Sequence, residues 1–72
     1  MHKKSITIDG HRTSVALEAD FWRELSAIAR ERQLSLNALI AEIDRGKGEP
    51  GNLSSALRLF VLRALRGRIN RA

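Results

Sequence analysis

Residues 12–17 alternate polar and apolar side chains, and the pattern then changes to helical spacing. Strict alternation is typical of a β-strand with one buried face. A lone strand leaves its backbone N–H and C=O groups without partners, so it needs a second strand. Because the chain offers few strands, a second copy of the chain is one expected partner.

A second candidate strand lies just upstream. Residues 5–8 alternate in the same way, and Asp9-Gly10 follows. Asp-Gly favours a two-residue type I′ turn, because both central residues of that turn need a positive φ. Such a turn would place Ile8 opposite His11 and Ser5 opposite Ser14.

This hairpin register sorts the side chains by polarity, because directly opposed residues share a face. One face would carry Ile6, Ile8, Thr13, Val15 and Leu17. The other face would carry Ser5, Thr7, Arg12, Ser14 and Ala16. The alternative is a flexible arm over residues 1–9 ahead of a single strand, and the pattern does not decide between the two.

Three helices are expected after the strands. Apolar residues at i, i+4, i+7 and i+8 from Phe21 predict a helix over 19–32. Ser35 is a suitable N-cap for a second helix over 35–44, and Gly46 is a suitable C-cap for it.

A loop is predicted over 45–52, with Asn52 as the cap of a third helix over 53–68. That third helix is apolar over most of its circumference. A helix of this kind must be packed between other elements or buried in a subunit interface.

The length of 72 residues predicts a single domain over 1–72, near the lower limit for a useful core. There is no cysteine to supply a disulfide, so oligomerisation is the expected source of further burial. The lack of cysteine also fits a cytoplasmic location. The longest apolar run, 59–62, is too short to span a membrane, and no apolar stretch follows the basic N-terminus as in a signal peptide.

The net charge of +5 is unevenly distributed. Residues 18–24 are acidic, whereas five arginines without any acidic residue occupy 58–71. A basic chain with separated charge blocks favours a polyanionic partner, nucleic acid before membrane.

The order of strand, helix and helix over residues 11–44 resembles the ribbon-helix-helix family of the MetJ and Arc type. The resemblance is carried by the strand 12–17, by a helix with Phe21, Leu25 and Ile28, and by the turn 33–40. The stretches 10–14 and 52–60 resemble a small bacterial subgroup with a third helix. The implied fold is mainly α with a short β-ribbon, an intertwined homodimer with a third C-terminal helix.

The resemblance also implies a transcriptional regulator that binds double-stranded DNA through an antiparallel ribbon in the major groove. The base-reading positions would be Arg12, Ser14 and Ala16. Arg12 can offer two donors to guanine, whereas Ala16 departs from the polar residues usual there. The start of the second helix, with its free N–H groups, would bind a phosphate. The phosphate-binding set would be Ser35, Leu36, Asn37, Lys3 and Lys4.

A protein-interaction module, antitoxin-like or an adaptor, is the alternative, with the third helix as docking surface for a second protein. The sequence has no nucleophile elbow, phosphate-binding glycine loop or zinc signature, so we expect neither an enzyme nor a cofactor. His2 and His11 alone make no metal site, and no metal is expected.

Overall fold

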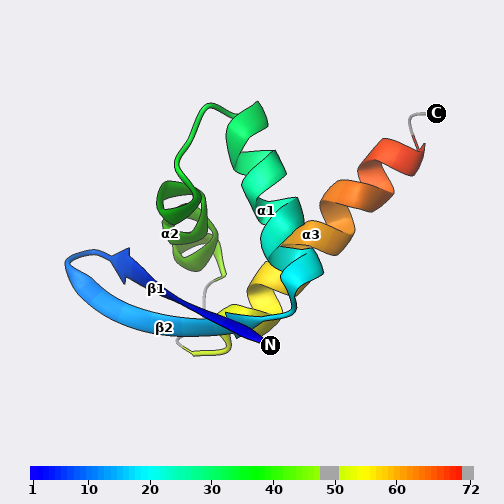
Figure 1. Ribbon diagram of the computed structural model, residues 1–72. Coiled ribbons are helices and arrows are strands. Elements are labelled where there is room, and N and C mark those ends of the chain that lie inside the picture. The colour runs from blue at the N-terminus through cyan, green and yellow to red at the C-terminus, as the bar shows by residue number, and fades with distance from the viewer. Residues whose placement is uncertain (48–50, 71–72) are drawn as a thin grey trace.

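The hairpin runs along the helices and leaves one of its faces open (Figure 1). The structure is a computed structural model that describes residues 1–47 and 51–70. Its elements follow in the order β1 (His2–Ile8), β2 (His11–Leu17), α1 (Ala19–Glu31), α2 (Leu36–Gly46) and α3 (Leu53–Asn70).

β1 and β2 form an antiparallel pair within the chain. Ile8 lies opposite His11 and Ser5 opposite Ser14, so the predicted register is confirmed. Asp9 and Gly10 both have a positive φ, 49° and 81°, as a type I′ turn requires. The flexible-arm alternative is therefore wrong, and β2 finds its strand partner within its own chain rather than in a second copy.

The predicted division of the hairpin into two faces is also confirmed. Ile6, Val15 and Leu17 are buried, and Ile8 and Thr13 are half-buried on the same side. The opposite face is exposed except at Ala16, which is half-buried. The two-residue turn fixes the register of the hairpin, and the alternation along each strand then determines which side chains face the core.

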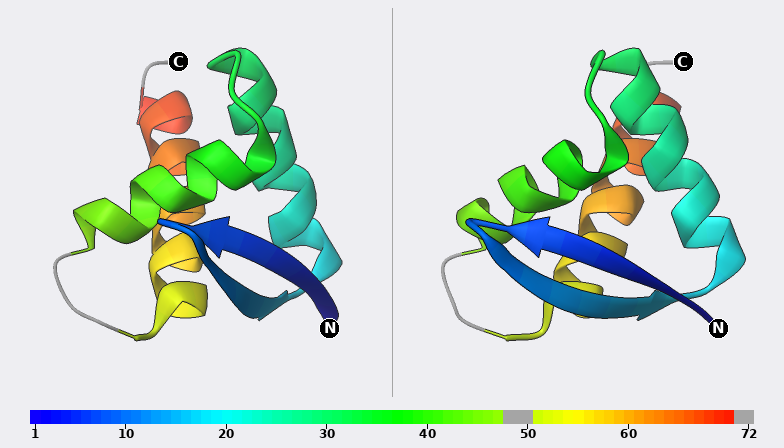
Figure 2. Two further views of the ribbon diagram at one scale, coloured as in Figure 1. Left: turned by 90° about the vertical axis from the view of Figure 1, so that its left-hand side faces the viewer. Right: turned by 60° about the vertical axis from the view of Figure 1, so that its left-hand side comes forward.

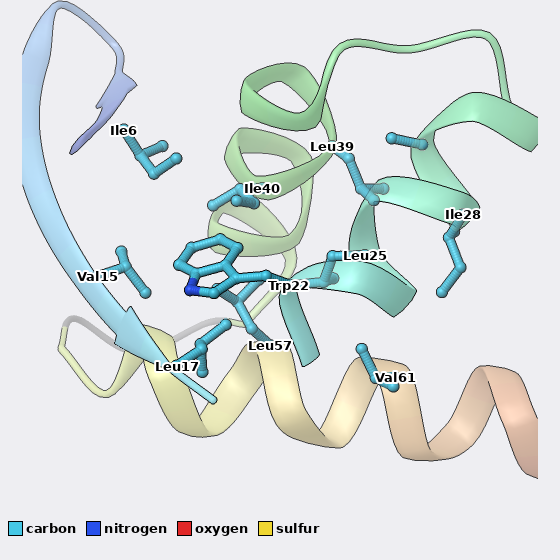
Figure 3. Packing of buried hydrophobic residues seen from close by; sticks show 11 residues of the cluster. Ile6, Val15, Leu17, Trp22, Leu25, Ile28, Leu39, Ile40, Leu57 and Val61 are labelled. Atoms are coloured by element: carbon cyan, nitrogen blue, oxygen red, sulfur yellow. The ribbon is translucent and has the colours of Figure 1, made fainter. Parts of the chain in front are cut away.

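One hydrophobic core joins the hairpin to all three helices (Figure 3). Trp22 is buried among these side chains, and its indole N–H donates to the carbonyl of His2 at 2.9 Å. Satisfying the indole N–H removes the cost of burying it. The other buried members include Leu25 and Ile28 of α1, Leu39 and Ile40 of α2, and Leu57 and Val61 of α3.

Several helix boundaries differ from the prediction by one or two residues. α2 continues through Gly46, so Gly46 is not its C-cap; that position is held by Lys47 with φ −78°. The predicted loop therefore begins later, and residues 48–50 lie outside the described residues. α3 starts at Leu53 as predicted but extends to Asn70.

α3 is clamped on one face only. Leu57 and Val61 are buried, whereas Leu59 and Leu62 are 44% and 50% exposed. The helix packs against α2, α1 and β2, and the views of Figure 2 show it crossing behind the hairpin and α2. The prediction that α3 packs between other elements is thus met on one side, and none of the described residues covers the other side.

Candidate nucleic-acid interface

The exposed face of the hairpin is a small polar surface. It is built from three cross-strand pairs, Thr7 with Arg12, Ser5 with Ser14, and Lys3 with Ala16. Five of these side chains are exposed, and none of the six is acidic. We call this set the hairpin reading face: Lys3, Ser5, Thr7, Arg12, Ser14 and Ala16.

The three predicted base-reading residues lie on this face, but they are not equivalent. Arg12 and Ser14 are exposed, and no ion pair joins Arg12 to an acidic side chain within residues 1–47 and 51–70. Ala16 is half-buried, and its carbonyl accepts a hydrogen bond from Ser54 Oγ at 3.3 Å. The start of α3 therefore borders the reading face at its Ala16 end.

The N-terminus of α2 carries the predicted phosphate-binding residues. Ser35 is its N-cap, and its Oγ accepts a hydrogen bond from the backbone N–H of Ala38 at 3.0 Å. The N–H groups of Leu36 and Asn37 belong to the first turn, where no intrahelical acceptor is available. Within the described residues they donate to no other group. These two donors remain free to bind an anion.

Asn37 joins the helix terminus to the hairpin. Its Oδ1 accepts from the backbone N–H of Thr7 at 2.9 Å, and its Nδ2 donates to the carbonyl of Thr7 at 2.7 Å. The residues beside a two-residue turn form a hydrogen-bonded pair, so the backbone of the next residue, Thr7, points away from β2. The side-chain amide of Asn37 therefore occupies the outer edge of β1 in the way that the backbone of a third strand would.

This contact brings together two elements, the hairpin and the start of α2, that the sequence pattern predicts only separately. The free N–H groups of α2 lie beside the edge of the hairpin reading face. No local pattern signals the contact, because Thr7 and Asn37 are thirty residues apart in the chain. The predicted role of Asn37 therefore rests on its backbone N–H, while its side chain has a structural partner.

The two predicted phosphate-binding lysines lie on opposite faces of β1. Lys3 is opposite Ala16 on the hairpin reading face, whereas Lys4 is opposite Val15 on the core side. The Lys4 ammonium lies 5.5 Å from the centroid of the Trp22 ring, which is within the range of a cation–π contact. The alternation of the strand separates the two lysines, so they do not form one basic patch.

The arginines of α3 are partly neutralised by α1. Arg58 donates to Glu18 Oε1 at 3.0 Å, and Arg68 pairs with Glu31. A hydrogen bond from its own backbone and the Arg58 contact hold the pKa of Glu18 below its usual value. Arg63 and Arg66 have no ion-pair partner in the part of the chain that the structure describes. The acidic and basic blocks of the sequence thus meet in space.

Two other kinds of site find no support in the described residues. No group of three or more His, Cys, Asp or Glu side chains in residues 1–47 and 51–70 could hold a metal ion. None of the helices described there combines the length and the apolar character needed to cross a bilayer.

A two-stranded ribbon followed by helices, with a free helix N-terminus beside the ribbon, defines the class of protein. A family model described as a ribbon-helix-helix domain matches residues 1–65, and the chain belongs to this family. Its members are typically dimeric DNA-binding regulators or antitoxins and are generally not enzymes. Searches of curated proteins and of solved structures found no match.

Proposed function

We propose that this protein binds double-stranded DNA by placing the hairpin reading face in the major groove. The proposal rests above all on the Asn37 contact, which holds the N-terminus of α2 against the edge of β1. Side chains of the hairpin would then meet base edges while the free N–H groups of α2 meet a flanking phosphate.

The dimensions of the groove favour the hairpin of a single chain as the inserted ribbon. Neighbouring strands lie about 4.8 Å apart, and a major groove about 12 Å wide admits two of them. A second copy pairing with the free edge of β2 would make four strands, with about 14 Å between the outer two. An intertwined ribbon would therefore require β1 to leave β2, and we propose instead that each chain inserts its own hairpin.

The residues of the reading face have distinct proposed roles. Arg12 donates to the two acceptors of a guanine, and Ser14 bonds to a neighbouring base. Ala16 reaches only a thymine methyl, at the end of the face next to α3. Ser5, Thr7 and Lys3 extend the contact across β1. Among the phosphate contacts, we retain the start of α2 and Lys3, whereas Lys4 is held at Trp22.

The biological role that follows is that of a homodimeric transcriptional regulator in a bacterial cytoplasm. Two copies would place two hairpins in successive major grooves on one side of the duplex, as dimeric regulators do on paired half-sites. The hairpins do not have to pair with each other for this arrangement. The two copies would then be joined through a surface other than the hairpins.

Selection of bound duplexes from a random pool tests the proposal, followed by titration of the selected duplex over a range of salt. We expect one enriched sequence and a steep loss of affinity with salt. Binding to phosphates releases the cations condensed on the DNA, and added salt opposes that release. Arg12→Ala should lower the affinity for the selected duplex more than for a random one. Arg30→Ala, an exposed arginine on α1, is the control. The absence of salt-dependent binding would refute the proposal.

A protein-interaction module is the second candidate function. It is favoured by the exposed leucines of α3, Leu59 and Leu62, which residues 1–47 and 51–70 leave uncovered. The DNA titration separates the two candidates, because a pure interaction module leaves duplexes unbound at every salt concentration.

A further inference from the structure

The uncovered side of α3 has a regular pattern of its own. Its positions recur at steps of four, three, four and three residues, which is the spacing of a coiled-coil seam. Leu59, Leu62 and Ile69 are 44%, 50% and 72% exposed. We call the five exposed positions the α3 seam: Ser55, Leu59, Leu62, Arg66 and Ile69.

The α3 seam is separate from the face that packs in the core. Leu57 is fully buried, and Leu59 follows it by about 200° around the helix. A helix of 18 residues is about 27 Å long and offers two such faces along its whole length. In Figure 1, the C-terminal half of α3 extends away from the hairpin and α2. A second helix could therefore reach the seam without displacing the core.

We propose that a second copy of this chain occupies the α3 seam, with the two α3 helices antiparallel about a two-fold axis. This arrangement places Leu59 of each copy opposite Leu62 of the other, so the same contact occurs twice. It also places Arg66 opposite Ser55 of the second copy. The seam is thus self-complementary, as an isologous interface requires.

Charge selects the antiparallel direction. In a parallel pair, Arg66 would lie opposite Arg66 of the second copy, and α3 has no acidic residue to relieve the repulsion. A single charged residue in a seam position is a known determinant of register and orientation. Arg66 also has no ion-pair partner among the described residues, so it is free to lie beside Ser55 of the second copy.

A cleft beside the seam adds to the surface that a second copy would cover. It has a volume of about 570 Å³ and lies between α2 and α3, with Leu59 and Phe60 on one wall and Ile43 on the other. The Arg32 guanidinium lies 5.5 Å from the centroid of the Phe60 ring at this cleft. The apolar surface therefore continues from the seam toward α2.

Sedimentation velocity over a range of protein concentration, without DNA, tests the proposal. The wild-type chain should pass from one chain mass to two as the concentration rises. Leu62→Arg should weaken association by at least about tenfold, as expected for a central contact of an interface. Arg66→Leu should strengthen it by about tenfold, because a desolvated charge is removed from the seam. Arg30→Leu, an equal gain of exposed apolar surface on α1, should change nothing.

Circular dichroism checks that each variant keeps its fold. We expect the fold to be retained, because the substituted side chains are exposed. A wild-type chain that stays monomeric at every concentration would overturn the proposal, as would a Leu62→Arg variant that dimerises like the wild type. The proposed DNA binding is not needed for this assay, so either idea can fail without the other.

The orientation of the two α3 helices can be tested by disulfide cross-linking, because the chain has no cysteine of its own that would interfere. Ser55→Cys and Arg66→Cys variants should form a disulfide-linked dimer with each other when mixed and oxidised, and much less with themselves. Each variant linking mainly to itself would indicate a parallel pair and refute the antiparallel seam. A lack of any cross-link above that of an Arg30→Cys control would refute the interface itself.

Discussion

The hairpin and α3 each bury one face in the same core, and they differ in what they leave outside. The hairpin exposes hydroxyl groups, Lys3 and Arg12, whereas α3 exposes Leu59 and Leu62. An exposed polar face with no acidic residue suits the base edges and phosphates of DNA. An exposed apolar face at coiled-coil spacing suits another helix. We propose that this difference assigns DNA binding to the hairpin and assembly to α3.

The largest effect is expected on stability, where substitutions on the buried and the exposed face of α3 should differ. Leu57→Ala should destabilise the fold by about 2–5 kcal/mol, because Leu57 is fully buried and a cavity remains. Leu59→Ala, two residues away, should cost less than about 1 kcal/mol in dilute protein, since its side chain is 44% exposed. Urea unfolding of both variants measures the contrast. Equal losses would mean that α3 does not have two distinct faces.

The next effect concerns recognition by the hairpin. Arg12→Ala should weaken binding to the selected duplex by about 1–3 kcal/mol, the usual value of a guanine contact. The salt dependence should change little, because a base contact neutralises no phosphate. Fluorescence anisotropy with selected and random duplexes measures both quantities. An equal loss on every duplex would instead make Arg12 a backbone contact.

The Asn37 contact should have a smaller effect on stability but a clear local signature. Asn37→Ala removes two hydrogen bonds and should cost about 1–2 kcal/mol. Hydrogen exchange provides the sharper test: the Thr7 amide should be protected in the wild type and lose protection in the variant. The amide of Ser5 faces the same edge with no such acceptor, and it should exchange rapidly in both. Unchanged protection of Thr7 in the variant would contradict the role given to Asn37.

The smallest effect is expected at Glu18. Its pKa is lowered in the folded state by a hydrogen bond from its own backbone and by Arg58, so its contribution to stability is present above the unfolded pKa. That contribution is lost as the pH falls through the folded pKa. Glu18→Gln should therefore make the stability less sensitive to acid below about pH 4, near the usual carboxyl pKa. Thermal unfolding of both proteins between acid and neutral pH measures this, and parallel curves would show that Glu18 contributes nothing.

Local patterns were sufficient for the elements and the faces of the hairpin. Asp9-Gly10 determined the turn, and the turn determined the register, because each residue of a strand has only two directions to point. The same alternation separates Lys3 from Lys4, so the grouping of both as phosphate ligands went against the pattern. Gly46 was assigned as a cap from its residue type, but the helix continues through it.

The long-range contacts could not be read from the sequence. The side chain of Asn37 bonds to a strand thirty residues earlier, and Arg58 reaches Glu18 from forty residues away. Such pairs depend on how the helices cross, which no local spacing encodes. The apolar circumference of α3 predicted a helix packed between other elements or buried in a subunit interface, and the structure covers one of its sides. Which side the chain covers became clear only from the packing of Leu57 and Val61.

The most direct test of the division between the two regions is a titration of isotope-labelled protein with the selected duplex, followed by NMR of the backbone amides. The largest shifts should occur in the hairpin reading face, from Lys3 to Ser14, and at Leu36 and Asn37. The amides of Leu59 and Leu62 should stay unchanged at a protein concentration where the chain is already dimeric. Shifts concentrated around Arg63 and Arg66, with an unaffected hairpin, would contradict the proposed mode of DNA binding.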